Sequence, residues 1–259
     1  MTDLFGQGGY DVRFEWGLAG ARAVRADAAV VVDVLSFSTA VTVAVERGMT
    51  VFPYRWETDG AEAYAAERDA VLAAGRGEAP GPDGVPAPSL SPAALRACRP
   101  VERLVLPSPN GSTIAAELRE HGGRVAVGCL RNATATARWL AQALDGGRSV
   151  AVIAAGERWA QDGSLRPALE DHLAAGAILS GVVGRGHGER MSPEGHAAAS
   201  LMEVSRARVG ERMQDCVSGR ELIGRGHGAD VAVAAELDVS AVVPELIDGA
   251  FGWPGRGRR

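Results

Sequence analysis

Acidic, hydroxyl and amide side chains recur directly after the apolar runs of this chain. Carboxylates suit a hard divalent cation, whereas hydroxyl, amide and guanidinium groups suit an oxyanion. A phosphorylated small molecule bound through a metal would use both kinds of group. The candidates for this chemistry, grouped by the run that they follow, are Asp33, Ser36, Ser38 and Thr39; Asn110, Gly111 and Ser112; Arg131 and Asn132; and Glu157, Arg158, Asp162 and Ser164, with Glu170 and Asp171 in the helix beyond.

The elements that position these residues are expected to form an α/β fold. Nearly continuous apolar runs that alternate with helical stretches are typical of parallel strands buried on both faces. The pattern predicts a three-layer α/β/α domain over residues 1–250 with a largely parallel or mixed sheet, as one lobe or as two fused lobes. Ligands of such sheets bind beyond the carboxyl ends of the strands, so the candidates are expected to meet there. We expect strands over 29–34, 103–106, 125–129 and 149–154, and helices over 39–47, over 112–120, up to 144, and from 167 to about 179.

The rest of the chain shows weaker patterns. Residues 75–92 are rich in Gly and Pro and predict a loop or flap, and residues 251–259 predict a flexible polar tail. A long helical segment is expected over 192–213 and a short strand over 239–243. The sequence GRGHG begins at Gly184 and again at Gly224, and we interpret both copies as flexible surface loops.

Composition excludes several classes of protein. The chain has 259 residues, of which 46% are hydrophobic and 23% charged, so it is expected to fold rather than to be disordered. The net charge is −5 and the basic residues are scattered, which argues against a nucleic-acid partner. No apolar run is long enough to span a bilayer and no signal peptide is recognised, so a cytoplasmic protein without a membrane partner is expected. The 3 cysteines predict neither a disulfide framework nor a zinc cage.

All 27 basic residues are arginine, and this excludes chemistry that requires an amine. P-loop phosphate binding, kinase-type nucleotide binding and Schiff-base catalysis are thereby excluded. The familiar phosphatase signatures are absent as well: no cysteine is followed six positions later by arginine, and Leu35 stands where a haloacid-dehalogenase-type enzyme has its second Asp. No zinc-binding helix motif or nucleophile elbow occurs.

Each candidate also has a structural interpretation. Ser38, Ser112 and Asn132 are placed where helix N-caps occur, and Asn110-Gly111 suits a turn. The pair Glu170 and Asp171 falls in a first helical turn, where the helix dipole favours acids. Asp33 is the strongest functional candidate, because a carboxylate that ends a buried strand needs a partner or a metal.

A set of segments in fixed order adds to this picture: DVLSFSTAVTVAVERG, LPSPNGSTIA, GCLRNATATARWL, IAAGERWAQDGSLRPALEDHLAAGAIL and DCVSGRELIGRGHGADVAVAAELDVSAVVPELIDGAF. Together they resemble the 2-phosphosulfolactate phosphatase family over nearly the whole chain. The resemblance implies a Mg²⁺-dependent hydrolase that converts 2-phospho-3-sulfolactate to 3-sulfolactate and phosphate, a step associated with coenzyme M synthesis.

The resemblance also implies site residues. The family's D-x-L-x-x-S-T pattern falls on Asp33, Ser38 and Thr39, and its other motifs on Asn110-Gly111, Asn132, Gly156-Glu157 and Glu170-Asp171. Our hypothesis is that Mg²⁺ is held by two or more of Asp33, Glu157, Glu170 and Asp171, and that Asp33, Glu170 and Asp171 are the catalytic acids. The substrate would be bound by Ser38, Thr39, Asn110, Gly111, Ser112, Asn132, Arg131 and Arg158, with Arg166 as a further candidate for its sulfonate or carboxylate.

Departures from the family pattern leave alternatives open. The usual R-A-S-T-T motif lacks its arginine, because Ser36 stands in that place, and the usual G-N-S-P falls at best on Ser89-Leu90-Ser91-Pro92. A phosphatase for a different phosphorylated hydroxy acid, or a protein that binds an anionic metabolite without hydrolysing it, would also fit. The sequence does not decide whether Asp33 is a nucleophile or a metal ligand, and it allows an oligomer as well as a monomer.

Overall fold

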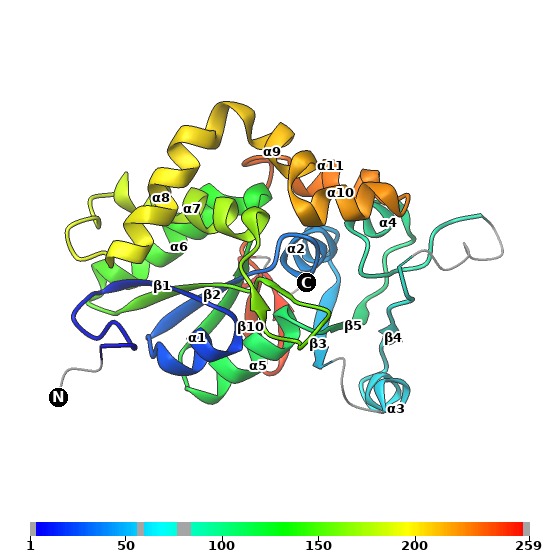
Figure 1. Ribbon diagram of the computed structural model, residues 1–259. Coiled ribbons are helices and arrows are strands. Elements are labelled where there is room, and N and C mark those ends of the chain that lie inside the picture. Colours follow the sequence, from blue (N-terminus) through cyan, green and yellow to red (C-terminus); the bar gives the residue numbers. More distant parts are fainter. Residues whose placement is uncertain (1–3, 56–59, 77–83, 256–259) are drawn as a thin grey trace.

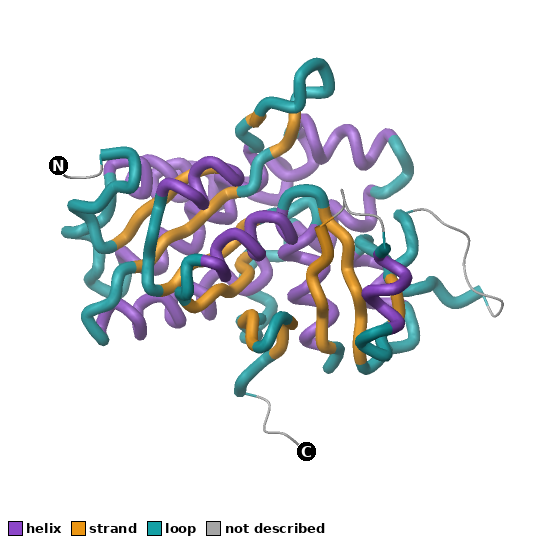
Figure 2. Tube along the Cα trace, turned by 90° about the horizontal axis from the view of Figure 1, so that it is seen from below, coloured by secondary structure: helices purple, strands orange, loops and turns teal. Residues whose placement is uncertain are grey.

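The computed structural model describes residues 4–55, 60–76 and 84–255. Within these ranges the main sheet has nine strands in the order β1-β7-β2-β6-β10-β11-β3-β5-β4 (Figures 1 and 2). The predicted α/β fold with a mixed sheet is therefore confirmed. The strands are β1 Val12–Trp16, β2 Ala28–Val32, β3 Thr50–Arg55, β4 Val71–Leu72, β5 Arg103–Ser108, β6 Arg124–Gly128, β7 Val150–Ala154, β10 Glu245–Ile247 and β11 Ala250–Gly252.

The sheet consists of two blocks of parallel strands. Strands β1, β7, β2 and β6 pair in parallel, and so do β3, β5 and β4. The antiparallel hairpin β10–β11 joins the blocks, since β10 pairs with β6 and β11 with β3. Seen from below, the two blocks run in different directions (Figure 2).

Helices cover both faces of the first block. Figure 1 shows α6, α7 and α8 above β1 and β2, with α1 and α5 below them. Along β2, Val30 and Val32 belong to the core under α6–α8, whereas Val31 belongs to the core on the other face with α1, α2 and α5. This two-sided burial explains the continuous apolar run. The helices are α1 Gly17–Ala23, α2 Phe37–Glu46, α3 Ala61–Ala66, α4 Pro92–Ala97, α5 Gly111–Glu120, α6 Ala133–Asp145, α7 Leu169–Val183, α8 Pro193–Ser205, α9 Val209–Asp215, α10 Val217–Gly224 and α11 Gly228–Ala234, with short 3-10 turns η1 Leu130–Asn132 and η2 Arg206–Arg208.

The strand predicted over 239–243 is wrong. Its backbone groups bond to η1 and to side chains instead of a neighbouring strand. The N–H of Ser240 donates to the Arg131 carbonyl at 2.8 Å, the N–H of Val242 donates to the Ser240 hydroxyl at 3.1 Å, and the Val242 carbonyl accepts from the Asn132 amide at 2.9 Å. The strand β10 begins after Pro244. The predicted tail also starts too early, because Phe251 is fully buried in β11.

The remaining segments follow the expectations more closely. The segment between β7 and α7, for which no strand was expected, contains a small hairpin, β8 Glu157–Arg158 with β9 Leu165–Arg166. The helical segment over 192–213 is divided into α8, η2 and α9. The described part of the 75–92 loop has no regular element before Pro92 opens α4, and residues 77–83 and 256–259 lie outside the described residues. None of the helices seen in the described ranges is long and apolar enough to cross a membrane.

Candidate active site

A cavity of about 310 Å³ lies beyond the ends of β2, β5 and β7, where the first turns of α2 and α5 begin. Helix α10 contributes the opposite wall. This is the edge of the sheet at which ligands of parallel sheets bind. The lining residues with polar or charged side chains are Asp33, Ser36, Arg76, Ser108, Asn110, Glu157, Ser218, Glu221 and Arg225.

Asp33 caps the start of α2 and reaches α5. Its Oδ1 accepts the backbone N–H groups of Ser36 at 3.1 Å and Phe37 at 3.3 Å, and its Oδ2 accepts that of Gly111 at 2.9 Å. Burial raises the pKa of Asp33, although these backbone N–H groups and the Arg76 guanidinium oppose the rise. The carboxylate is therefore held rigidly at the cavity, with the positive ends of two helices directed at it.

Asp171, in the first turn of α7, is bound on both oxygens. Its Oδ1 accepts the N–H of Val34 at 2.7 Å and its Oδ2 accepts that of Gly156 at 2.8 Å. These bonds tie the segments that follow β2 and β7 to α7. Burial, together with the charges of Asp33 and Glu170, raises the pKa of Asp171 well above its ordinary value. The structure thus brings Asp33 close to the Glu170–Asp171 pair.

Asp171 and Glu170 do not line the cavity directly. Glu170 is 2% exposed and lies close enough to Glu157 and Cys216 to raise the pKa of each. Because Asp171 does not line the cavity and both its oxygens accept backbone N–H groups, we assign Asp171 a positioning role, not a contact with substrate. Glu170 remains a candidate acid behind the cavity wall.

Glu157 is an acid that can exchange a proton near neutral pH. Its pKa is raised to about 7, chiefly by burial and then by the negative charges of Asp33 and Glu170. The Arg166 guanidinium opposes this rise. Groups whose environment is arranged in this way occur most often at functional sites.

The acids do not form a complete metal cage. Across residues 4–55, 60–76 and 84–255, no three His, Cys, Asp or Glu side chains stand together in a way that could hold a metal ion. Mg²⁺ differs from zinc and calcium in this respect, because it usually binds one or two carboxylates and completes its shell with water and substrate phosphate. Asp33 and Glu157 line the same cavity and fit that mode of binding.

Several predicted substrate ligands are used by the backbone instead. The Ser38 hydroxyl donates to the carbonyl of Val31 at 3.0 Å and accepts the N–H of Asp33 at 2.9 Å. The Thr39 hydroxyl donates to the Val34 carbonyl at 2.8 Å. Ser38, Thr39 and Ser112 are also buried, so their side chains shape the Asp33 turn and the start of α5 and do not face a substrate.

Asn110 lines the cavity and contacts Arg158, which lies outside its lining. The Asn110 amide donates to the Gly156 carbonyl at 3.2 Å, and its Oδ1 accepts the Nε–H of Arg158 at 3.3 Å. Asn110 lines the cavity, whereas Arg158 lines a neighbouring depression with Arg22. Both remain candidates for binding substrate.

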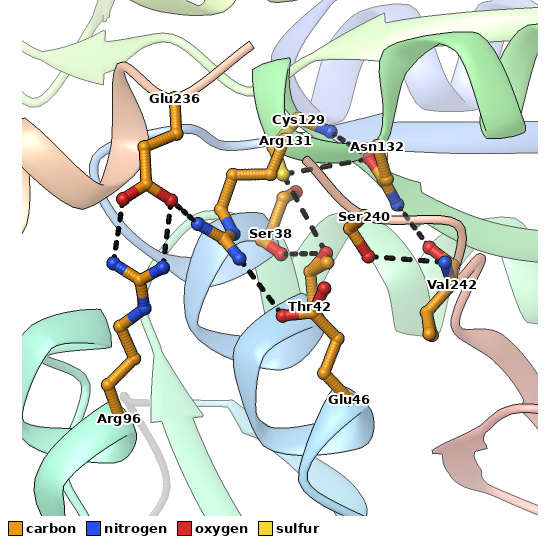
Figure 3. A network of polar contacts seen from close by, with 10 residues as sticks. All are labelled: Ser38, Thr42, Glu46, Arg96, Cys129, Arg131, Asn132, Glu236, Ser240 and Val242. Atoms are coloured by element: carbon orange, nitrogen blue, oxygen red, sulfur yellow. Dashed lines mark hydrogen bonds and ion pairs between the residues drawn. The ribbon is translucent and has the colours of Figure 1, made fainter. Parts of the chain in front are cut away.

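Arg131 and Asn132 belong to a separate buried network, shown in Figure 3, and the expectation that they bind substrate is corrected. The Arg131 guanidinium pairs with Glu46 at 3.0 Å and with Glu236, and Glu236 also binds Arg96. The Asn132 Oδ1 accepts the N–H of Cys129 at 2.9 Å. Neither residue lines the cavity, because their polar atoms fix the 236–242 segment against η1 and α2.

Sequence reasoning missed the cavity residues that come from outside the strand ends. Arg76 lies in the 75–92 loop, and Ser218 and Glu221 lie on α10. Arg225 belongs to the second GRGHG copy, which was interpreted as a surface loop. One signal could have pointed to them. The segment that contains α10 is part of the family resemblance, but no site residue had been assigned in it.

Comparison with known proteins agrees with this geometry. Residues 19–249 match the model of the family described as 2-phosphosulpholactate phosphatase. A protein of Deinococcus radiodurans with the name "Probable 2-phosphosulfolactate phosphatase" is 30% identical over 227 residues, which cover 86% of this chain and 89% of the relative. The chain belongs to the 2-phosphosulfolactate phosphatase family.

As a member of the 2-phosphosulfolactate phosphatase family, the protein is a phosphoric monoester hydrolase and acts on a small phosphorylated molecule. Its cavity size agrees with a small substrate. Ser36, which stands where the 2-phosphosulfolactate phosphatase motif has arginine, lines the cavity. The cavity therefore lacks the guanidinium group that the arginine of the family motif would supply at this position.

Proposed function

We propose that this protein is a Mg²⁺-dependent phosphatase that hydrolyses 2-phospho-3-sulfolactate to 3-sulfolactate and inorganic phosphate in the cytoplasm, as a step of coenzyme M synthesis. Family membership and the name of the relative support this substrate. The observation that carries the proposal is the meeting of Asp33 with the Glu170–Asp171 turn beside one small cavity.

Mg²⁺ would be held by Asp33 and Glu157 at the cavity wall, with Glu170 behind them. When bound, the cation would neutralise phosphoryl oxygens and orient the attacking water. Hydrolysis of phosphate monoesters is very slow in water, so electrostatic stabilisation of this kind has to supply a large reduction of the barrier. The donor set agrees with such a cation, since it combines hard carboxylate oxygens with a cavity large enough for water and phosphate.

The residues of the chain hold the site in shape. Asp171 fixes Val34 and Gly156, and so keeps Asp33 and Glu157 on the same wall. We assign Asp33 to the cation and not to nucleophilic attack on phosphorus, because the N–H groups of Ser36, Phe37 and Gly111 draw charge from its carboxylate. Asn110 is directed to the substrate at the cavity mouth.

The test is phosphate release from 2-phosphosulfolactate with Mg²⁺ and with EDTA. Turnover that requires Mg²⁺, and that is lost in Asp33→Asn, is the expected result. Release that is unaffected by EDTA, or an Asp33→Asn variant that turns over like the parent, would reject the proposal. Asp162→Asn is the matched control, because Asp162 is exposed in the β8–β9 turn, where its carboxylate accepts from the backbone N–H and hydroxyl of Ser164.

A second candidate function is hydrolysis of a different phosphorylated hydroxy acid. The presence of Ser36 in place of the motif arginine favours it, because the contact that this arginine would make is lost. A panel of phosphorylated hydroxy acids with and without a sulfonate separates the two functions by kcat/KM. Stabilisation by the intact esters with no phosphate release over hours would instead indicate a protein that only binds the anion.

A further inference from the structure

Two arginines line the cavity beside the acids. Arg76 comes from the loop after β4, and Arg225 follows the last turn of α10. Burial lowers the pKa of Arg76, the nearby carboxylates oppose this, and the charge of Arg225 adds to the lowering. Two cations that face one small cavity repel each other, and a bound anion would relieve that repulsion.

Arg76 is anchored from behind. Its Nε lies 3.3 Å from Asp230 Oδ2, and its NH2 group donates to the Leu90 carbonyl at 3.3 Å. Asp230 is itself fixed by the Ser91 hydroxyl and by the N–H of Ala93 at 3.1 Å. The side chain of Arg76 is 18% exposed, so the guanidinium is held at the cavity wall by a buried network.

Arg225 is positioned from its own helix. Its NH2 group bonds to Glu221 Oε1 at 2.7 Å, one turn earlier on α10. The side chain is 68% exposed, which leaves it able to meet a ligand at the cavity mouth. A guanidinium held by a single carboxylate oxygen keeps further N–H donors for an oxyanion.

The other GRGHG copy shows that the turn alone does not create a site. Both copies end a helix in the same way, with Gly186 at φ 89° and Gly226 at φ 86°. In the first copy, Arg185 donates to the Gly181 carbonyl at 2.7 Å on the surface. Arg185 lines neither the cavity beside Asp33 nor the depression with Arg22. Arg225 lines the cavity beside Asp33 and also a second cavity, which Arg185 does not line.

The second of these is a larger cavity of about 600 Å³ that adjoins the first. Arg76 and Arg225 line both cavities, together with Leu90 and Leu222. Asp33 and Glu157 do not line the larger one. The arginines therefore stand at the junction of the two cavities, whereas the acids that we assign to the cation and the phosphoryl group line only the smaller of the two.

We propose that Arg76 and Arg225 bind the sulfonate of the substrate, an anionic group separate from the phosphate, and so select phosphorylated acids that carry such a group. The inference rests on the proposed function, because it takes the phosphoryl group to lie on the Asp33 side. Arg76 and Arg225 would thus have the substrate-binding role that the sequence suggested for Arg131, which is buried in a different network. Guanidinium groups are well suited to this task because they bind oxyanions through two N–H groups at once.

The experiment compares two substrates, 2-phosphosulfolactate and 2-phospholactate, which lacks the sulfonate. In Arg225→Gln, KM for phosphosulfolactate should rise about tenfold or more, the loss expected for one charge-assisted hydrogen bond, while KM for phospholactate stays within about twofold. Arg225→Lys should recover only part of the loss, since it keeps the charge without the planar fork. Arg185→Gln, from the first GRGHG copy, is the matched control and should behave like the parent.

Binding of the product gives a readout that does not depend on turnover. The thermal shift produced by 3-sulfolactate should be reduced in Arg225→Gln and in Arg76→Gln, but unchanged in Arg185→Gln. Equal KM changes for both esters, or a normal sulfolactate shift in Arg225→Gln, would overturn the inference. If the parent binds sulfolactate through Arg225 yet releases no phosphate, the proposed phosphatase function fails while this inference stands.

Discussion

The carboxylate of Asp33 accepts the backbone N–H of Gly111 at 2.9 Å, and this bond joins the end of β2 to the first turn of α5. No side chain fits at position 111. A Cβ there would lie 2.3 Å from Phe37 Cδ1 and 2.8 Å from Asp33 Oδ2. Glycine is thus required by close packing around the acid that we assign to the cation.

Gly111→Ala should therefore destabilise the protein and disturb Asp33 together. Overpacking of this kind costs about 1–3 kcal/mol, and each 1 kcal/mol lowers Tm by about 2–4 °C in a chain of this size. Gly210→Ala is the control, because nothing lies within 4 Å of a Cβ at Gly210 in α9. Thermal unfolding and Mg²⁺-dependent phosphate release measure the two effects. A Gly111→Ala variant as stable and active as Gly210→Ala would show that the packing is not needed.

Glu170→Gln should separate activity from stability. Loss of the carboxylate is expected to reduce kcat about 100-fold or more, as for removal of one electrostatic contact at a transition state. The same change removes a negative charge near Asp171 and Glu157, so metal-free protein should become more stable. Urea unfolding in EDTA and phosphate release with Mg²⁺ provide the measurements. Glu203→Gln, on the exposed face of α8, should change neither quantity.

Asp171→Asn, in contrast to Glu170→Gln, should make the protein less stable. An amide can accept one of the two N–H groups that Asp171 binds, but its own NH2 group would then face the other. An unpaired buried donor costs about 1–3 kcal/mol, with or without Mg²⁺. Unfolding in urea with EDTA is the measurement. If Asp171→Asn matched Glu170→Gln in gaining stability, the positioning role of Asp171 would be wrong.

The fold could be predicted largely because its central strands are buried on both faces. Continuous apolar runs marked β2, β5, β6 and β7 within a few residues of their bounds. Strands at less regular positions gave no such signal: β3 contains Pro53, and the charged residues Arg13 and Glu15 interrupt β1. The apolar run 239–243 looked like a strand, but its backbone is satisfied by side chains such as Asn132.

The site could be predicted only in part, since residue type does not say which way a polar group is satisfied. Asp33 was singled out because a carboxylate at the end of a buried strand requires a partner, whereas the Glu170–Asp171 pair was singled out through the family resemblance. Ser38 and Asn132 have the same residue types as ligand-binding groups, yet the backbone uses them. Arg76 and Arg225 reach the cavity from segments outside the strand pattern, so only the tertiary structure brings them together.

Asn132→Ala tests whether Asn132 stabilises the fold and does not bind substrate. The change leaves the N–H of Cys129 and the carbonyl of Val242 without their partner, so stability should fall by about 1–3 kcal/mol. KM for phosphosulfolactate should stay within about twofold of the parent, because Asn132 does not line the cavity. Asn132→Asp, which keeps the acceptor for Cys129 only, should be intermediate in urea unfolding. A raised KM with unchanged stability would restore the original expectation.

Binding of Mg²⁺ should depend on pH through Glu157. In metal-free protein the pKa of Glu157 is raised from 4.5 to about 7, so between these values the folded state binds more protons than the unfolded state. The contribution of this group to stability therefore falls as the pH rises through that window. Mg²⁺ requires the carboxylate and releases its proton, so stabilisation by Mg²⁺ should grow from about pH 6 to about pH 8 and then level off.

The measurement is the difference in Tm with and without Mg²⁺ across this range at constant ionic strength. In Glu157→Gln the difference should be small and nearly independent of pH, because the titrating oxygen is gone. In Glu203→Gln the Tm difference should change with pH as it does in the parent. A Glu157→Gln variant that kept the full slope would show that another group takes up the proton, and Glu157 would then have to be removed from the set of candidate metal ligands.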